Sequence, residues 1–331
     1  MLLSKAKLLI RPINNIVYNY FHKINLSQAD MADKTNMIKL VKMCIPPLDG
    51  NSHKGQAGRI GIVGGSLEYT GAPYFAGISA LRVGADLSHI FCTTAAANVI
   101  KSYSPELIVH PLLDTKNAVA DISPWLERLH AIVIGPGLGR EAGTFKVVSE
   151  LIETIRQRRI PLVIDADGLF LITEQPELIK DFSSPVILTP NKIEFERLCV
   201  KLKGPEKLNE LGLHVTVLRK GTTDELYSNN PDAQWQSNIG GSGRRCGGQG
   251  DLLSGSIATF LHWTLSNIDK METGSKADNI FLAPSLSCYA ASLLVRQCNE
   301  KAFKNKGRSM LASDMIEYIH EAFEELFENK N

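Results

Sequence analysis

The chain has 331 residues, of which 44% are hydrophobic and 21% are charged, and its formal net charge is +1. This composition indicates a globular protein with a sizeable core and argues against a disordered chain. The first 29 positions contain four basic residues and no acidic ones, so the net charge of the remaining chain is 1 − 4 = −3. A slightly acidic chain argues against nucleic acid as a partner. These four residues are Lys5, Lys7, Arg11 and Lys23.

The N-terminal segment differs from the rest of the chain. Residues 2–26 mix apolar and basic side chains without a single acid. The charges interrupt any long apolar stretch, so the segment is more typical of a mitochondrial presequence than of a secretory signal. We expect residues 1–45 to form a leader, of which about the first 30 direct the protein to mitochondria. A leader without targeting value is the alternative, and an internal start at Met31 or Met37 would give a cytosolic form.

The cysteines and the longest apolar run indicate the redox environment of the protein and whether it spans a membrane. The six cysteines are scattered and form no Cys-x-x-Cys pair, so we expect reduced thiols in an intracellular protein. The run at 280–295 is short for a membrane span and contains Pro284. It therefore predicts a buried helix and no membrane partner.

From residue 46 onward, short β-rich runs alternate with amphipathic helical stretches. This alternation predicts one α/β domain, 46–331, with a mainly parallel central sheet and helices on both faces. Two runs at 224–228 and 234–238, separated by an Asn-Asn-Pro-Asp turn, predict a hairpin at one edge of the sheet. The other predicted strands are 59–63, 87–91, 131–134, 162–164, 186–188 and 215–218. The predicted helices are 72–83, 145–158, 193–199, 251–265, 285–297 and 312–327.

Glycine, proline and polar residues follow five of these strands at their carboxyl ends. In an open α/β sheet this edge forms the ligand crevice. Each cluster alone is explained by a strand exit, a helix cap or a turn, but five of them on one edge predict a binding site. The clusters are 64–66, 135–139, 165–168, 189–191 and 220–221.

A glycine-dense loop, 242–250, ends in Asp251 and leads directly into an apolar stretch. Glycines let backbone N–H groups turn toward an anion, and the first turn of a helix adds unpaired donors. The pattern predicts a phosphate site with Asp251 as a general base. A simple N-cap aspartate is the alternative, but such a cap rarely needs several adjacent glycines together with Arg244 and Arg245.

Other motif interpretations fit less well. The segment 135–139 approaches a dinucleotide fingerprint, but its third glycine comes one residue too early and Pro136 stiffens the turn. No phosphate-binding P-loop follows a predicted strand. The histidines lack the spacing of zinc ligands, so we expect packing or surface positions for them.

The chain resembles the ribokinase-like superfamily, whose members carry a glycine-rich anion hole ending in a catalytic Asp and an Asn-x-x-Glu motif. Within it, the chain is most similar to the ATP-dependent NAD(P)H-hydrate dehydratases, over residues 53–327. One departure is Asp86, where that family usually has glycine. The motifs that carry the resemblance are His53-Lys54-Gly55, Gly64-Gly65-Ser66, Tyr69-Thr70-Gly71-Ala72-Pro73, Gly135-Pro136-Gly137-Leu138-Gly139, Asp165-Ala166-Asp167, Asn191-Lys192-Ile193-Glu194 and 242–251.

The resemblance implies a ribokinase-like three-layer sandwich that dehydrates the 6S hydrate of NADH or NADPH, with ATP as co-substrate and Mg²⁺ as cofactor. Asp251 would be the catalytic base, and Glu194 would order magnesium through water. A homo-oligomer is also implied. Substrate-binding residues would be Gly137, Asn191, Lys192, Ile193, Glu194, Phe195, Glu196, Arg197 and Asp251. ATP-binding residues would be Lys220, Gly221, Thr222, Thr223, Asp224, Gly241, Ser242, Gly243, Arg244, Arg245, Cys246, Gly247, Gly248, Gln249 and Gly250.

Two alternatives remain open at this point. A small-molecule kinase of the same fold, acting on a vitamin-type alcohol such as a hydroxymethylpyrimidine, would also need Asp251 but would leave the phosphate on its product. A nucleotide-binding regulatory protein without catalysis would not need Asp251 and Glu194 intact.

Overall fold

The computed structural model describes residues 29–51, 53–270 and 276–328. The chain divides into residues 1–39 and residues 40–331. The predicted presequence falls almost entirely on residues 1–28, which lie outside the described residues. Helix α2 (Ala29–Cys44) begins directly after them, and the sequence patterns predicted no element there.

Strands and helices alternate along residues 40–331. The strands are β1 (Arg59–Val63), β2 (Leu87–Cys92), β3 (Leu107–Pro111), β4 (Ala131–Ile134), β5 (Leu162–Ile164), β6 (Val186–Leu188), β7 (Val215–Arg219), β8 (Asp224–Tyr227) and β9 (Trp235–Ser237). The α-helices after α2 are α3 (Gly71–Val83), α4 (Thr94–Tyr103), α5 (Ala118–Leu126), α6 (Ala142–Gln157), α7 (Ala166–Glu174), α8 (Lys192–Leu202), α9 (Gln249–Ser266), α10 (Lys276–Lys306), α11 (Ala312–Ile316) and α12 (Ile319–Phe323). Short 3₁₀ turns occur at Pro176–Ile179, Pro205–Leu211, Pro231–Ala233, Ile268–Lys270 and Gly307–Ser309, and a π-turn at Glu324–Glu328.

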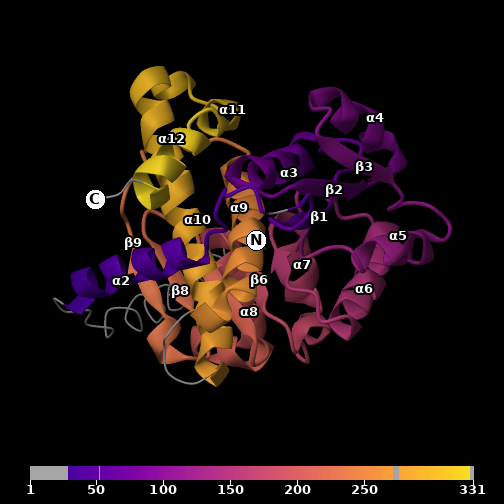
Figure 1. The fold of residues 1–331 in the computed structure, drawn as a ribbon. Coiled ribbons are helices and arrows are strands. Elements are labelled where there is room, and N and C mark those ends of the chain that lie inside the picture. Colours follow the sequence, from indigo (N-terminus) through magenta and orange to yellow (C-terminus); the bar gives the residue numbers. More distant parts are fainter. Residues whose placement is uncertain (1–28, 52, 271–275, 329–331) are drawn as a thin grey trace, which may run out of the picture. The chain divides into compact units, whose positions relative to one another are not determined.

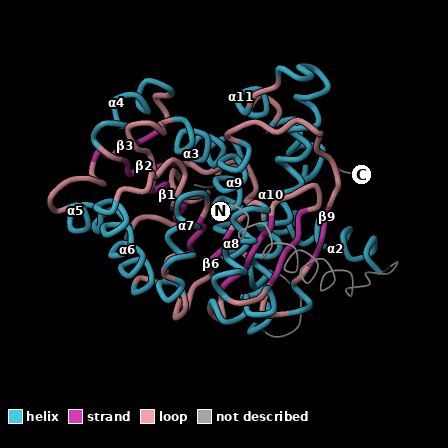
Figure 2. The backbone as a smooth tube through the Cα atoms, turned by 180° about the vertical axis from the view of Figure 1, so that it is seen from behind, coloured by secondary structure: helices cyan, strands magenta, loops and turns pink. Residues whose placement is uncertain are grey.

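The strands form one sheet in the order β3-β2-β1-β4-β5-β6-β7-β8-β9. All pairs from β3 to β7 are parallel, and β8 and β9 extend the sheet as an antiparallel hairpin. The chain moves outward from β1 in one direction and from β4 in the other, so right-handed crossovers place the connecting helices on opposite faces. Helices α3, α9 and α10 pack together on one face, and α6, α7 and α8 lie over the other (Figure 1). Seen from behind, the strands form a continuous band between the two helical layers (Figure 2).

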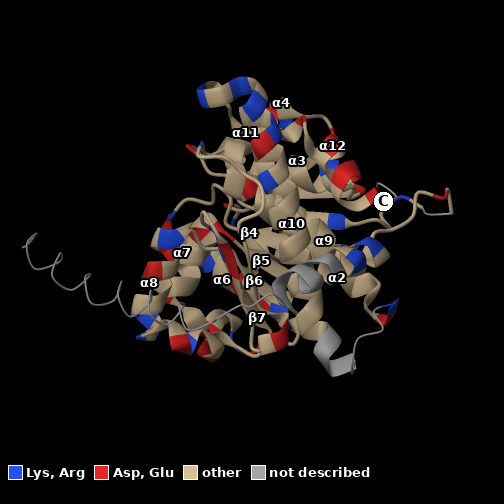
Figure 3. Ribbon diagram, turned by 90° about the vertical axis from the view of Figure 1, so that its left-hand side faces the viewer, with Lys and Arg blue, Asp and Glu red and all other residues tan. Residues whose placement is uncertain are grey.

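The centre of the sheet is fully apolar. Strands β4, β5 and β6 contain no charged residue, and all of their residues are buried, whereas charges lie on the outer helices (Figure 3). Near-continuous apolar strands of this kind are typical of a parallel sheet covered on both faces. The α/β class and the mainly parallel sheet predicted from sequence are therefore confirmed.

Some elements differ from the sequence prediction. Strand β3 and helices α4, α5 and α7 were not predicted, because β3 ends in His110 and Pro111 rather than in apolar residues, and the 165–168 cluster was interpreted as a loop. The helix predicted at 312–327 was wrong as a single element. The Tyr318 N–H bonds to the Met315 carbonyl, three residues back, which interrupts the α-helical pattern between α11 and α12. Pro284 lies inside α10 as expected, and no helix among the described residues is long and apolar enough to cross a membrane.

Asp86, the departure from the family pattern, has a structural role. Its Oδ2 accepts hydrogen bonds from the N–H groups of Gly55 and Ala57 at 2.8 and 2.9 Å. The carboxylate thereby fixes the loop that leads into β1, at the edge of the sheet opposite the predicted site.

Candidate active site at the carboxyl edge of the sheet

The exits of the parallel strands meet at one edge of the sheet, as the sequence predicted. The loops after β4 and β5 approach so closely that a Cβ on Gly135 would overlap the Asp165 carbonyl oxygen, and Gly135 has φ +124°. Only glycine fits this position. The contact places the 135–139 turn beside Asp165, and the strand order reverses between β1 and β4, which is where open α/β sheets bind ligands.

Helix α9 begins at Gln249, and its N-cap is Gly248 in the left-handed region with φ +93°. The helix therefore starts two residues earlier than predicted, and Asp251 lies in its first turn. The N–H groups of this turn have no partner within the helix, and together with the positive end of the helix dipole they favour an anion such as phosphate.

A buried ion pair lies beside this helix start. Lys220 Nζ donates to Asp165 Oδ1 at 2.7 Å, and Thr189 Oγ1 donates to the same oxygen at 2.9 Å. Asp165 is 2% exposed. Burial lowers the pKa of Lys220, but the attraction of Asp165, Glu194 and Asp251 outweighs it, so the net shift is upward. Lys220 is thus a permanent cation among three carboxylates.

The pKa of Asp251 lies well above its ordinary value. Burial is the largest cause, followed by repulsion from the Asp165 carboxylate, while the Lys220 ammonium opposes both. A carboxylate whose pKa is raised toward neutrality is a better general base than an exposed one. Asp251 is thus a buried carboxyl group of raised proton affinity at the start of α9.

Glu194 and Asn191 form the cap of α8. Asn191 Oδ1 accepts from the N–H groups of Ile193 and Glu194, and the Asn191 N–H donates to Glu194 Oε2 at 2.8 Å. Burial raises the pKa of Glu194, and Lys220 partly offsets this. One carboxylate oxygen of Glu194 thus has a structural partner in the capping box, so a charge-removing change can keep the cap.

A cavity of about 850 Å³ lies beside the glycine loop, between β7, α9 and α10. It brings together thirteen of the fifteen residues predicted to bind ATP; Thr223 and Arg244 are not among its lining residues. Its size is in the range of cofactor sites. Asn191, predicted as a substrate residue, also lines this cavity, and the sequence did not predict the lining contributed by Asn238, Gly240, Leu253, Ser292, Val295, Arg296 and Asn299.

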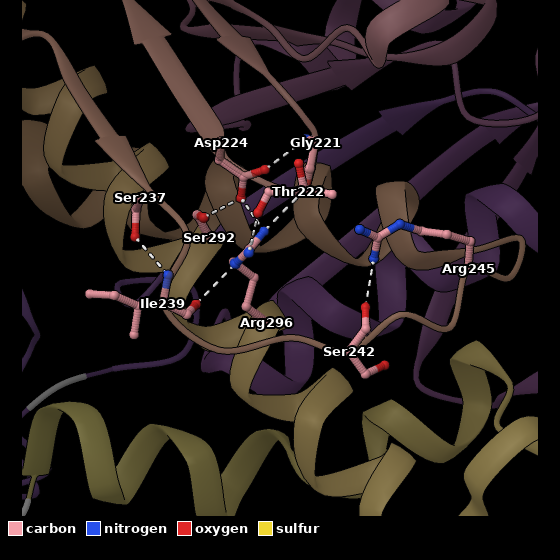
Figure 4. Close-up of polar contacts among 9 residues, drawn as sticks. All are labelled: Gly221, Thr222, Asp224, Ser237, Ile239, Ser242, Arg245, Ser292 and Arg296. Atoms are coloured by element: carbon pink, nitrogen blue, oxygen red, sulfur yellow. Dashed lines mark hydrogen bonds and ion pairs between the residues drawn. The ribbon is translucent and has the colours of Figure 1, made fainter.

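Arg296 organises one wall of this cavity (Figure 4). Its guanidinium donates to the carbonyl oxygens of Ile239 at 2.9 Å and Thr222 at 2.7 Å, and it lies 3.4 Å from Asp224 Oδ2. Ser292 donates to the same Asp224 oxygen at 2.6 Å. The arginine therefore ties the loop after β7 to the start of the glycine loop. The predicted ATP residue Asp224 supports this loop with its carboxylate rather than presenting a free charge.

The residues predicted to bind the substrate face different ways. Ile193 is 68% exposed, whereas Phe195 is 1% exposed and stacks on Tyr227 in the core. Gly137 contacts the loop after β1 through hydrogen bonds from Gly65 and Ser66 to its carbonyl oxygen. Ile193 is therefore accessible at the carboxyl edge of the sheet, the Gly137 turn packs against the neighbouring loop at the same edge, and the Phe195 side chain is buried away from it.

Asp165 is the principal site residue that the sequence analysis did not assign. The sequence feature that could have identified Asp165 is its position directly after a buried strand. In the structure the next residue, Ala166, has φ +46°, which is unusual for a residue with a Cβ. Arg296 and Ser292 carried no local signal, because they lie in the middle of a long helix far along the chain. No group of three or more His, Cys, Asp or Glu side chains among the described residues is arranged as a metal cage.

A family model, two sequence relatives and one solved structure similar to this chain are all described as NAD(P)H-hydrate dehydratases. A family model described as NAD(P)H-hydrate dehydratase matches residues 60–321. The ATP-dependent (S)-NAD(P)H-hydrate dehydratase of Aedes aegypti is 52% identical over 100% of this chain and 98% of its own, and the Homo sapiens protein of the same name is 48% identical over 99% and 94%. The ADP/ATP-dependent NAD(P)H-hydrate dehydratase of Bacillus subtilis, co-crystallised with ATP/Mg²⁺, has a TM-score of 0.64 at 21% identity and covers 87% of this chain and 97% of its own. A ribokinase-like superfamily protein of Enterococcus faecalis has a TM-score of 0.69 at 20% identity, covering 88% and 95%.

Proposed function

The chain belongs to the NAD(P)H-hydrate dehydratase family, and from this premise we propose that it dehydrates the 6S hydrate of NADH or NADPH, converting ATP to ADP and phosphate. The observation that carries the proposal is the placement of Asp251. This carboxylate lies in the first turn of α9, beside the Lys220–Asp165 pair and next to a cavity lined by the predicted ATP residues.

The reaction must turn hydroxide, a poor leaving group, into phosphate. Asp251 accepts the proton of the ring hydroxyl as its oxygen attacks the γ-phosphorus of ATP, and ADP departs. Loss of phosphate from the hydroxylated carbon and of a proton from its neighbour then restores the ring double bond. Atoms and charge balance as hydrate plus ATP giving NAD(P)H, ADP, hydrogen phosphate and one proton.

The glycine loop and Lys220 act on the phosphates. The N–H groups at the start of α9 are fixed donors toward the charge that develops on the transferring group. A Cβ on Gly250 would lie 3.0 Å from Lys220 Nζ, so the lysine is directly beside the first turn of α9. Lys220 thereby adds a cation at the same point.

Magnesium fits the donors present in this cleft. Asp165 and Glu194 offer carboxylate oxygens, and Mg²⁺ prefers one or two carboxylates together with phosphates and water to an all-protein cage. Glu194 would hold the ion through water, because one of its oxygens already accepts the Asn191 N–H. The ion would neutralise charge on the ATP phosphates.

One assay tests the reaction. Purified protein is incubated with NADH hydrate, ATP and magnesium, and the near-ultraviolet absorbance of reduced nicotinamide is followed together with phosphate release. The proposal predicts both signals in equal amounts. The vitamin-kinase alternative predicts a phosphorylated alcohol and no reduced nicotinamide, and a regulatory protein predicts neither.

We also propose that residues 1 to about 30 direct the protein to mitochondria and that the enzyme is a homo-oligomer. The acid-free basic leader supports the first point, and the family resemblance supports the second. Sedimentation of the purified protein tests the assembly state.

A further inference from the structure

Two arginines from different segments lie on one aromatic ring at the edge of the crevice. The Cζ atom of Arg140, after β4, is 4.3 Å from the ring centroid of Phe170 on α7. The Cζ atom of Arg197, on α8, is 5.6 Å from the same centroid. We call Arg140, Phe170 and Arg197 the arginine platform. A guanidinium over an aromatic face is held by cation–π attraction, so the ring positions both charges.

The platform is built into the fold on the site side. Asp167, in the first turn of α7, accepts from Arg140 Nε at 2.9 Å and from the Gly139 N–H at 3.1 Å. Phe145 of α6 stacks on Phe170 with ring centroids 6.1 Å apart. Arg140 is therefore fixed by a carboxylate and a ring, although its side chain remains 55% exposed.

The platform has more positive than negative charge. Asp167 pairs with Arg140, while Arg197 forms no ion pair with any described residue. Arg197 also acts electrostatically on Glu194, in the first turn of the same helix, where its charge opposes the burial that raises the pKa of that carboxyl group. Two planar guanidiniums on one ring, of which one is paired with a carboxylate, suit an anion that can accept paired hydrogen bonds, such as a phosphodiester.

The position of the platform separates it from the ATP cavity. Among the described residues that line that cavity, neither Arg140 nor Arg197 occurs. Arg140 follows Gly137 by three residues, and Arg197 is in α8. Both arginines thus lie outside the lining of the ATP cavity, one in the loop after β4 and the other in the helix capped by Asn191.

A dinucleotide substrate has an anionic pyrophosphate bridge between its two nucleosides. When the hydrated ring is at Asp251, the bridge must lie farther along the crevice. We propose that Arg140 and Arg197, held on Phe170, bind this pyrophosphate bridge and so position the hydrated ring; the inference rests on the proposed function. The bridge is common to the NADH and NADPH hydrates, so the platform serves both.

Arg140→Gln and Arg197→Gln test the inference. Each variant should raise KM for NADH hydrate and for NADPH hydrate about tenfold or more, because a charge-assisted contact is lost. The KM for ATP should stay within about twofold. With the hydrate of reduced nicotinamide riboside, which has no phosphate, variants and wild type should differ little. Arg140→Lys should be intermediate, because it keeps the charge but not the planar fork.

Arg128→Gln is the matched control, because Arg128 also lies over an aromatic ring, 5.8 Å from the Trp125 centroid, but precedes β4 at the opposite edge of the sheet. It should leave every KM unchanged. Equal losses with the riboside and the dinucleotide would overturn the inference and indicate a general structural role. A loss confined to NADPH hydrate would assign the platform to the 2′-phosphate instead. Absence of wild-type turnover would overturn the proposed function itself, whereas active wild type with an unchanged Arg140→Gln variant overturns this inference alone.

Discussion

Lys220 donates a 2.7 Å hydrogen bond to Asp165, and this pair connects the exit of β7 to the exit of β5 directly beside the start of α9. Burial and the Asp165 carboxylate raise the pKa of Asp251, and the Lys220 ammonium lowers it. The pair therefore sets the proton affinity of the proposed base as well as the charge near the phosphates.

Lys220→Met should shift the acid limb of the pH–rate profile to higher pH. Turnover requires ionised Asp251, so activity falls as pH drops through its raised pKa, and without the ammonium that pKa rises further. Stability should also fall by about 3 kcal/mol, because Asp165 is left buried without its cation. Turnover measured against pH checks the shift, and an acid limb at the wild-type position would show that Lys220 does not act on the base.

Arg296→Gln should weaken ATP binding and leave the second substrate unaffected. The arginine ties the carbonyl groups of Thr222 and Ile239 together, so its loss frees the loops that line the cavity. We expect KM for ATP to rise about tenfold, which is roughly 1.4 kcal/mol. Ser292→Ala removes one other partner of Asp224, which still accepts from the Gly221 N–H, and should have a smaller effect. Titration of both substrates tests this, and an equal rise in both KM values would contradict it.

The sequence predicted the sheet interior better than its edges. Buried apolar runs such as Ala131–Ile134 match the predicted strands, because nothing but a covered sheet accommodates them. Lys220 and Asp251 were also predicted, since glycines and strand exits mark them locally. Arg296 was not predicted, because its role depends on α10 packing beside β7 and β8 after folding. Arg197 was predicted as a substrate residue, but its convergence with Arg140 on Phe170 depends on three separate helices and loops.

Residues 1 to about 30, fused to a fluorescent reporter, should direct it to mitochondria, and a chain starting at Met31 should stay cytosolic. The reason is the basic, acid-free composition of the leader. Replacing its four basic residues by Gln is the control and should abolish import. A diffuse cytosolic signal from the intact leader would contradict the prediction.

Glu194→Gln should weaken the dependence of turnover on magnesium while the fold survives. The amide oxygen of glutamine can still accept the Asn191 N–H, so the capping box persists, but the charge that would order the ion through water is lost. A higher magnesium concentration for half-maximal rate, with melting temperature within about 2 °C, is the expected result. An unchanged magnesium titration would remove Glu194 from the metal site.

Asp251→Asn provides the most direct test of the mechanism. It keeps the shape of the side chain but removes the proton acceptor, so turnover should fall about 10² to 10⁴-fold, or roughly 3 to 5 kcal/mol of barrier. ATP affinity should hold or improve slightly, because one negative charge near the phosphates is gone.

The stability of the same variant separates a base from a purely structural residue. Because the folded-state pKa of Asp251 is raised above its unfolded value of 3.8, its carboxyl group costs no stability in acid, where it is protonated in both states; the cost builds up as pH rises from 3.8 to the folded pKa and is constant above it. Asp251→Asn should therefore be more stable than wild type at neutral pH, by about 1 kcal/mol, and this difference should vanish in acid. The N-cap of α9 is Gly248, so the alternative is a purely structural role for Asp251 in the first turn, which predicts nearly unchanged turnover. Turnover, ATP affinity and melting temperature against pH decide between the two, and near wild-type turnover would exclude Asp251 as the base.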